Sequence, residues 1–184
     1  MRKLIYSINL TLDGCCDHTK GIADENLHRF YADLLRQADT FVYGRKTFEL
    51  MVPFWPDVAR NNSGPNKAFN DFARAFVSAR EIVVFSRTLT ETAEKNVRIV
   101  RGDLRDEILG LKEQEGGPIL AGGVDVPSQL IQLGLVDEYI LVIHPVVVGE
   151  GRRLLEHVSL QRHLKLLKTE QLQSGCIILY YSKA

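Results

Sequence analysis

The sequence predicts an α/β fold in three layers, with a mainly parallel sheet between helices and an antiparallel hairpin at the carboxyl end. Apolar runs typical of strands alternate with segments of helical periodicity as far as Gly134, and strand-like segments alone follow from residue 137. The chain has 184 residues, of which 45% are hydrophobic, so it can bury one core without disulfides or metal. We therefore expect a single domain over residues 1–184.

The predicted strands are short runs of β-branched and aromatic residues bounded by turn residues. The turn pair Asp13-Gly14 closes the first strand, and the turn at 173–175 joins the last two strands into a hairpin. The run at 119–121 is short and apolar, which is typical of a central strand. In chain order the predicted strands are 3–10, 41–44, 81–86, 97–100, 119–121, 137–148, 164–172 and 176–182.

The predicted helices carry apolar residues three and four positions apart and have start or stop residues at their ends. Asp24 or Asp17 is expected to cap the first helix. Asp125 is expected to cap the last, which has Pro127 near its start and Gly134 just past its end. Residues 52–56 are expected to be irregular because their prolines oppose a helix. The predicted helices are 24–37, 65–79, 103–115 and the segment between Asp125 and Gly134.

Composition excludes several classes of function. The 23 basic and 23 acidic residues balance, so no overall field attracts nucleic acid or a membrane surface. No stretch resembles a membrane span or a signal-peptide core, and a cytoplasmic protein is expected. The three cysteines and five histidines have no metal-ligand spacing, so no metal is expected and each histidine is interpreted as structural or solvated.

Three predicted strands end in residues suited to a phosphate. Gly44-Arg45-Lys46-Thr47 follows the strand at 41–44, and the other two strand ends are Ser86-Arg87-Thr88 and Ala121-Gly122-Gly123. Glycine lets backbone approach a ligand, the N–H groups of a helix start favour an anion, and Arg, Ser and Thr add hydrogen bonds. In parallel sheets, ligands bind outside the carboxyl ends of the strands. Together the three ends indicate one extended ligand that carries phosphate.

Six motifs spread over nearly the whole chain: Leu-Asp-Gly at 12–14, Gly-Arg-Lys-Thr-Phe-Glu at 44–49, Val-Phe-Ser-Arg at 84–87, Gly-Gly at 122–123, Leu-Gly-Leu-Val-Asp-Glu at 133–138 and Pro-Val-Val-Val-Gly-Glu-Gly at 145–151. Together they resemble the dihydrofolate reductase superfamily. The similarity is greatest to the branch containing the reductase half of the bifunctional riboflavin-biosynthesis deaminase-reductase. That resemblance implies the dihydrofolate reductase-like fold, NADPH as cofactor and a homodimer.

The resemblance also implies roles for individual residues at the cofactor. Gly44, Arg45, Lys46 and Thr47 would form a phosphate corner, and Ser86 and Arg87 would hold the adenosine ribose and its 2′-phosphate. Gly122, Gly123 and Val124 would meet the pyrophosphate at a helix start, with Gly14 beside the nicotinamide. Two arginine forks would favour NADPH over NADH. Alternatively, Arg45 and Arg87 form surface ion pairs.

The substrate residues follow the family patterns less closely. The carboxylate that holds the pterin in dihydrofolate reductases falls near His28 here, and the acidic position of the riboflavin branch falls at Leu120. Asp13 is the candidate catalytic carboxylate, although Asp-Gly is also an ordinary turn pair. Phe48 and Trp55 are candidate substrate contacts, and Trp55 would alternatively pack on the core from a loop.

The expected function is an NADPH-dependent reductase that transfers hydride to a small heterocycle. The ribosylaminopyrimidine of riboflavin biosynthesis, 5-amino-6-(5-phosphoribosylamino)uracil in type, is the first candidate substrate, and dihydrofolate or another pteridine is the second. A non-catalytic nucleotide-binding or regulatory protein is the alternative of another class.

A second copy of the chain is the expected protein partner. The apolar segments at 137–148, 164–172 and 176–182 lie beyond the last predicted helix, and a two-fold partner would cover them. Alternatively, helices from earlier in the chain fold back over these segments. A charge at Val142 or Ile178 is expected to dissociate or destabilise this dimer.

Overall fold

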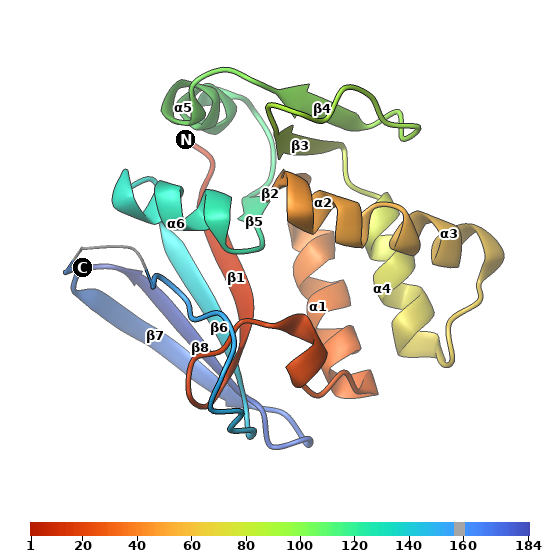
Figure 1. Ribbon diagram of the computed structural model, residues 1–184, viewed down its shortest axis with the longest axis vertical. Helices are drawn as coiled ribbons and strands as arrows, with labels where there is room; N and C mark the ends of the chain where they lie inside the picture. Colours follow the sequence, from red (N-terminus) through yellow and green to blue (C-terminus); the bar gives the residue numbers. More distant parts are fainter. Residues whose placement is uncertain (157–160) are drawn as a thin grey trace.

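The structure, a computed structural model, describes residues 1–156 and 161–184; His157, one of the five histidines, lies outside them. Its centre is one eight-stranded sheet with the order β4-β3-β2-β5-β1-β6-β8-β7. The strands from β4 to β6 are parallel, and β8 and β7 are antiparallel to their neighbours. Helices cover both faces of the parallel part (Figure 1). The predicted fold class is confirmed.

All eight predicted strands are present, with ends that differ by a few residues. The strands are β1 (Leu4–Thr11), β2 (Thr40–Gly44), β3 (Glu81–Phe85), β4 (Val97–Val100), β5 (Ile119–Ala121), β6 (Glu138–His144), β7 (Leu164–Gln171) and β8 (Ile177–Lys183).

The predicted helices are present too, together with short ones that the sequence left undefined. The helices are α1 (Glu25–Gln37), α2 (Arg45–Met51), α3 (Phe54–Asn61), α4 (Lys67–Val77), α5 (Leu104–Glu113) and α6 (Asp125–Gln132), with a 3-10 turn at His18–Lys20. None of the described helices is both long and apolar enough to cross a membrane.

Three local predictions were wrong. Residues 54–61 form α3, because Pro56 lies in the first turn, where backbone N–H groups have no acceptor within the helix. Strand β6 stops at His144, since Pro145 cannot donate to a neighbouring strand and the Val146 N–H turns back to the His144 carbonyl at 2.8 Å. The residue that precedes α6 is Val124, so Asp125 is its first residue rather than its cap.

The core has one layer on each face of the sheet. On one face α1 and α4 pack on the sheet, and Phe41, Phe76 and Ile178 are fully buried there. On the other face α5 and α6 pack on the sheet through Ile108 and Leu130. This arrangement leaves the carboxyl ends of the parallel strands at one edge, where the functional site forms.

Candidate cofactor and substrate site

A notch in the sheet creates the site. The central strand β5 is only three residues long, and its last residue, Ala121, pairs with Tyr6 on one side and Val42 on the other. Strand β1 continues to Thr11 beside β6, so from Ser7 onward β1 has no β5 residue opposite it. The space left by the missing part of β5 becomes a cavity of about 890 Å3.

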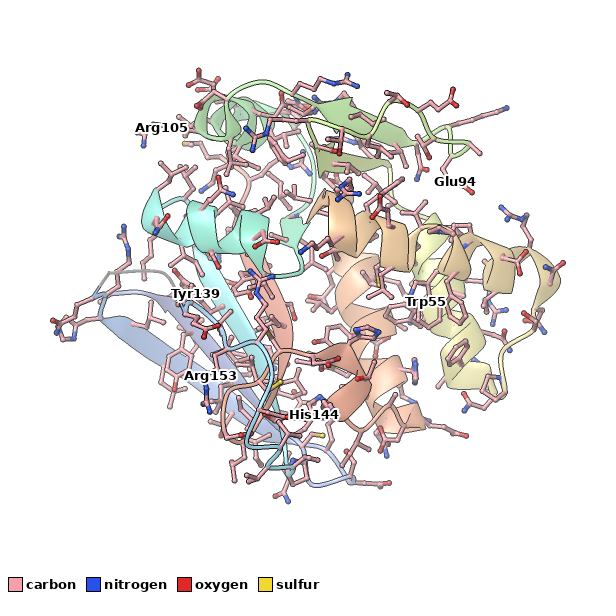
Figure 2. All side chains as sticks on the ribbon, viewed as in Figure 1. Trp55, Glu94, Arg105, Tyr139, His144 and Arg153 are labelled. Carbon is pink, nitrogen blue, oxygen red and sulfur yellow. The ribbon has the colours of Figure 1, made fainter. Side chains whose placement is uncertain are left out.

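Residues from both halves of the chain line this cavity. They come from β1, α1, α2, α3, α4, the β5–α6 turn and β6. Figure 2 shows two of them, Trp55 on α3 and His144 on β6, which contribute from separate parts of the fold. Helix α1 supplies Leu27 and Leu35, so much of the wall is apolar.

The β5–α6 turn meets the start of α2 at one end of the cavity. Gly123 has a φ of +86°, and a Cβ there would overlap the Thr47 hydroxyl. Helix α6 begins at Asp125 without a side-chain cap, so its first N–H groups are free to meet an anion. The predicted residues Lys46, Thr47, Gly122, Gly123 and Val124 all line the cavity here. The donor set fits a pyrophosphate.

Asp125 adds a negative charge to the same corner. Its carboxylate accepts a hydrogen bond from Arg152 Nη2 at 2.5 Å. That bond lowers the pKa of Asp125, and burial offsets part of the effect. The ion pair joins α6 to the segment after β6, and it leaves Lys46 as the nearby cation that can face an anion.

The other predicted cofactor residues lie outside the cavity. Arg45 and Ser86 follow Gly44 and Phe85, which are paired in register, so they share one sheet edge. The Ser86 hydroxyl accepts hydrogen bonds from the N–H groups of Thr88 and Leu89, and Arg87 is exposed. Arg45 pairs with Glu49 at 3.0 Å, as its alternative interpretation expects. Gly14 is near the opposite end of this edge, with open space around it.

The Asp13 carboxylate forms hydrogen bonds that join the end of β1 to the segment after β6. It accepts hydrogen bonds from the Thr11 hydroxyl at 2.6 Å and from the Gly149 N–H at 2.8 Å. These bonds lower the pKa of Asp13 to about 2. Asp13 does not line the cavity, and its catalytic role stays a prediction. Phe48 is 5% exposed and belongs to the hydrophobic core behind the cavity.

Trp55 and His28 form an aromatic wall. His28 Nδ1 donates to the Asp24 carbonyl at 2.7 Å, and its ring lies 6.1 Å from Trp55 and 4.8 Å from Phe69. Trp55 in turn packs 4.3 Å from Phe72, measured between ring centroids. The sequence predicted that Trp55 either contacts the substrate or packs on the core from a loop. It lies on a helix, packs on the core and lines the cavity.

Sequence reasoning missed the polar side of the cavity. Ser7, Asn9 and Thr11 alternate along β1 and therefore share one face of an otherwise apolar strand. His144, 1% exposed, accepts from the Ile22 N–H at Nδ1 and donates from Nε2 to Asn9 Oδ1 at 3.0 Å. Burial lowers the pKa of His144, which keeps the ring neutral. The alternating Ser-x-Asn-x-Thr pattern was the available signal.

These features define a class: a dihydrofolate reductase-like α/β fold with a ligand cavity at the carboxyl ends of its parallel strands. The chain belongs to the RibD C-terminal domain family, whose model matches residues 2–178. The family resemblance drawn from the motifs is thereby confirmed, and a reductase family of this kind implies an oxidoreductase.

The chain is also similar to known sequences and, in fold, to solved structures. The uncharacterised protein YyaP of Bacillus subtilis strain 168 is 33% identical over 186 residues, covering 98% of this chain and 94% of that protein. A putative riboflavin biosynthesis protein from Shewanella sp. PV-4 has a TM-score of 0.75 at 20% identity, with 99% of each chain covered. RibD of Acinetobacter baumannii has a TM-score of 0.66 at 19% identity, and all of this chain matches 58% of that one.

Proposed function

We propose that the protein is an NADPH-dependent reductase of a small planar heterocycle. The observation that carries the proposal is the cavity itself, whose lining includes Lys46, Thr47 and the uncapped start of α6 as well as Trp55, which packs on Phe72. Membership of a reductase family supports the same reaction class. When bound, NADPH would supply a hydride to an unsaturated carbon of the substrate, and a proton from water would complete reduction of the double bond.

The chain's own residues would hold and align the two reactants. Lys46, Thr47 and the α6 start would hold the pyrophosphate, and Gly123 lets the backbone approach it. Arg45 and Arg87 stand at the neighbouring sheet edge, where a 2′-phosphate would extend out of the cavity. The apolar wall with Trp55 would exclude water and hold a flat ring against the nicotinamide.

Two substrates are candidates for this cavity. A ribosylaminopyrimidine of riboflavin biosynthesis is the first, because the chain belongs to the RibD C-terminal domain family, one structural relative is named a riboflavin biosynthesis protein and another a 5-amino-6-(5-phosphoribosylamino)uracil reductase. A pteridine is the second, because the aromatic wall suits any flat heterocycle. Assaying NADPH oxidation with a panel of pyrimidines and pterins would separate both from a non-catalytic nucleotide-binding protein, which would bind NADPH without consuming it.

The cofactor assignment predicts a preference for NADPH over NADH. Replacing Arg45 or Arg87 with Ala should weaken NADPH binding by about 1.5 kcal/mol or more, roughly tenfold, because a charge-assisted contact to the 2′-phosphate is lost. NADH binding should not change. Calorimetric titration of both nucleotides measures this, with Arg36→Ala as control because Arg36 pairs with Asp33 on α1. Equal affinity for the two nucleotides in the unmodified protein would contradict NADPH specificity, and no binding of either would contradict the reductase.

A further inference from the structure

The charges that line the cavity are balanced. The basic side chains in the lining, counting Lys and Arg, are Lys46 and Arg152, and the acidic side chains are Asp17 and Asp125. Arg152 is already paired with Asp125, and Lys46 stands at the corner assigned to the cofactor pyrophosphate. A phosphate on the substrate would therefore find no remaining Lys or Arg within the described lining. The four residues 157–160, His-Val-Ser-Leu, add neither of these two residue types.

The cavity lining also contains two hydroxyls without hydrogen-bond partners. Ser7 is 8% exposed, and its Oγ atom is buried without a hydrogen-bond partner in the described protein. The same holds for the hydroxyl of Tyr31 on α1. Both residues line the cavity. A buried hydroxyl without a hydrogen bond is unfavourable, so two beside one cavity point to a ligand that provides the partners.

The two hydroxyls are close to each other and can act together. Burial raises the pKa of the Tyr31 phenol far above its usual range, and the neighbouring Ser7 hydroxyl acts in the opposite direction. Tyr31 therefore stays protonated and can donate, and each hydroxyl can also accept. Such a pair is complementary to a ring edge that presents a carbonyl beside an N–H group.

We propose that the substrate is an uncharged planar heterocycle without a phosphate group, and that the Ser7 and Tyr31 hydroxyls bind its polar ring edge. This inference rests on the proposed function and narrows its substrate. Pteridines and unphosphorylated aminopyrimidines fit it, because both carry a carbonyl and an N–H on one edge. The phosphoribosyl form of the same pyrimidine does not fit, because its dianion would face the apolar and acidic parts of the lining.

Two pairs of ligands that differ only in phosphorylation test the substrate class. One pair is 6-hydroxymethyl-7,8-dihydropterin and its diphosphate, and the other is 5-amino-6-ribosylaminouracil and its 5′-phosphate. Each is titrated calorimetrically into the full chain saturated with NADP+, so that the cofactor corner is filled. In at least one pair, we expect the unphosphorylated ligand to bind at least about tenfold more tightly than the phosphorylated one. Tighter binding of the phosphorylated members, or no binding by any of the four, would overturn the inference.

Variants without the hydroxyls test the two residues. Ser7→Ala and Tyr31→Phe should each weaken binding of the unphosphorylated ligand about 3- to 10-fold, because one neutral hydrogen bond is lost. NADP+ affinity should not change, and the melting temperature should stay equal or rise, because no hydrogen bond within the protein is broken. Tyr180→Phe is the control, since the Tyr180 hydroxyl bonds Glu170 outside the cavity.

The outcomes separate this inference from the proposed function. A lower melting temperature with unchanged ligand binding would show that the hydroxyl pair is structural and would overturn the inference. Failure of NADPH and NADP+ to bind the unmodified protein would instead contradict the proposed function. If the protein binds NADPH but prefers phosphorylated ligands, the result would be consistent with the proposed reductase and would contradict the proposal of an unphosphorylated substrate.

Discussion

Asp13 shows how a residue suited to chemistry can serve the architecture. The end of β1 is tied to the segment after β6 through Asp13, whose carboxylate accepts from Gly149, and through the Leu12 N–H, which donates to the Val146 carbonyl at 2.8 Å. Arg153 adds a hydrogen bond from its guanidinium to the Asp13 carbonyl at 2.5 Å. These contacts hold the rim of the cavity, so removal of the charge would act on stability first.

The lowered pKa of Asp13 predicts a pH-dependent stability. Its folded pKa is about 2, below the value of about 3.9 for an unfolded aspartate, so its contribution is present above pH 4 and is lost as pH falls toward 2. Asp13→Asn should therefore lower the melting temperature at pH 7, and the difference from the unmodified protein should shrink between pH 4 and 2. Thermal unfolding over pH 2–7 measures this, with Asp33→Asn, on the exposed face of α1, as control. A difference that stays constant over that range would argue against the assignment.

At the residue scale, the sequence predicted the parts of the site whose chemistry is local. Lys46, Thr47, Gly122 and Gly123 were predicted because a glycine or a helix start follows a strand directly, and all four line the cavity. The polar side was missed because its contacts are distant in sequence: His144 and Asn9 are 135 positions apart. His144 and Asn9 can bond only because β1 and β6 are neighbours in the sheet, and no local sequence pattern predicts that pairing.

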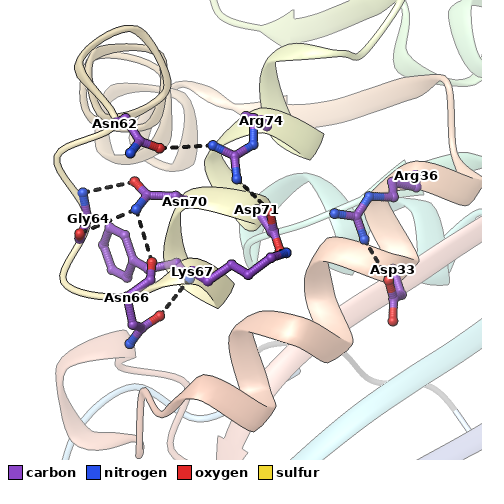
Figure 3. A network of polar contacts seen from close by, with 10 residues as sticks. Asp33, Arg36, Asn62, Gly64, Asn66, Lys67, Asn70, Asp71 and Arg74 are labelled. Atoms are coloured by element: carbon purple, nitrogen blue, oxygen red, sulfur yellow. Dashed lines mark hydrogen bonds and ion pairs between the residues drawn. The ribbon is translucent and has the colours of Figure 1, made fainter.

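At the scale of elements, the α3–α4 pair determines the aromatic wall of the cavity. Trp55 lies on α3 and Phe72 on α4, and the loop between the helices is held by a polar network (Figure 3). Asn70 is its centre: its Oδ1 accepts from the Gly64 N–H at 2.9 Å, and its Nδ2 donates to the carbonyls of Gly64 and Asn66. The sequence predicted α4 from its periodicity but not α3, because Pro56 was interpreted as a helix breaker.

This network predicts an element-scale effect on stability. Asn70 is 7% exposed, so Asn70→Ala should cost about 1–3 kcal/mol by leaving the Gly64 N–H and two carbonyls without their partner. Lys67→Ala is the matched control on the same helix. Its side chain is 85% exposed and pairs with Asp71 at the surface, so its loss should cost about 0–1 kcal/mol. Urea unfolding measures both free energies, and equal costs would contradict the role given to Asn70.

At the scale of the whole molecule, the sequence predicted the layers from the alternation of strands and helices, but not the strand order. That order depends on pairings such as β1 with β5 and β6, which join segments far apart in the chain. The final hairpin extends from this sheet, and in Figure 1 none of the described helices lies over β7. The predicted dimer concerns this region.

The two faces of the final strands differ in their cover. Val142 and Ile178 are fully buried against the layer that contains α1. A charge at either would therefore destabilise the monomer itself, and neither position can report on a dimer. We call the opposite face of β6, β8 and β7 the hairpin face, and the strand register determines which residues lie on it. Its partly exposed apolar residues include Leu141, Ile143, Leu166, Ile177, Leu179 and Tyr181.

The hairpin face predicts a homodimer. Leu166 is 50% exposed and the other five side chains are half-buried, which forms an apolar strip beside an edge strand whose backbone groups are open on one side. A two-fold partner would bury the same strip twice. Light scattering should therefore give twice the monomer mass of 20.8 kDa at micromolar concentration, and Leu166→Glu with Leu179→Glu should restore that monomer mass without unfolding the chain. Val77→Glu is the control, because Val77 is 41% exposed at the end of α4, away from the hairpin face. A mass of 20.8 kDa for the unmodified protein at every concentration would exclude the dimer.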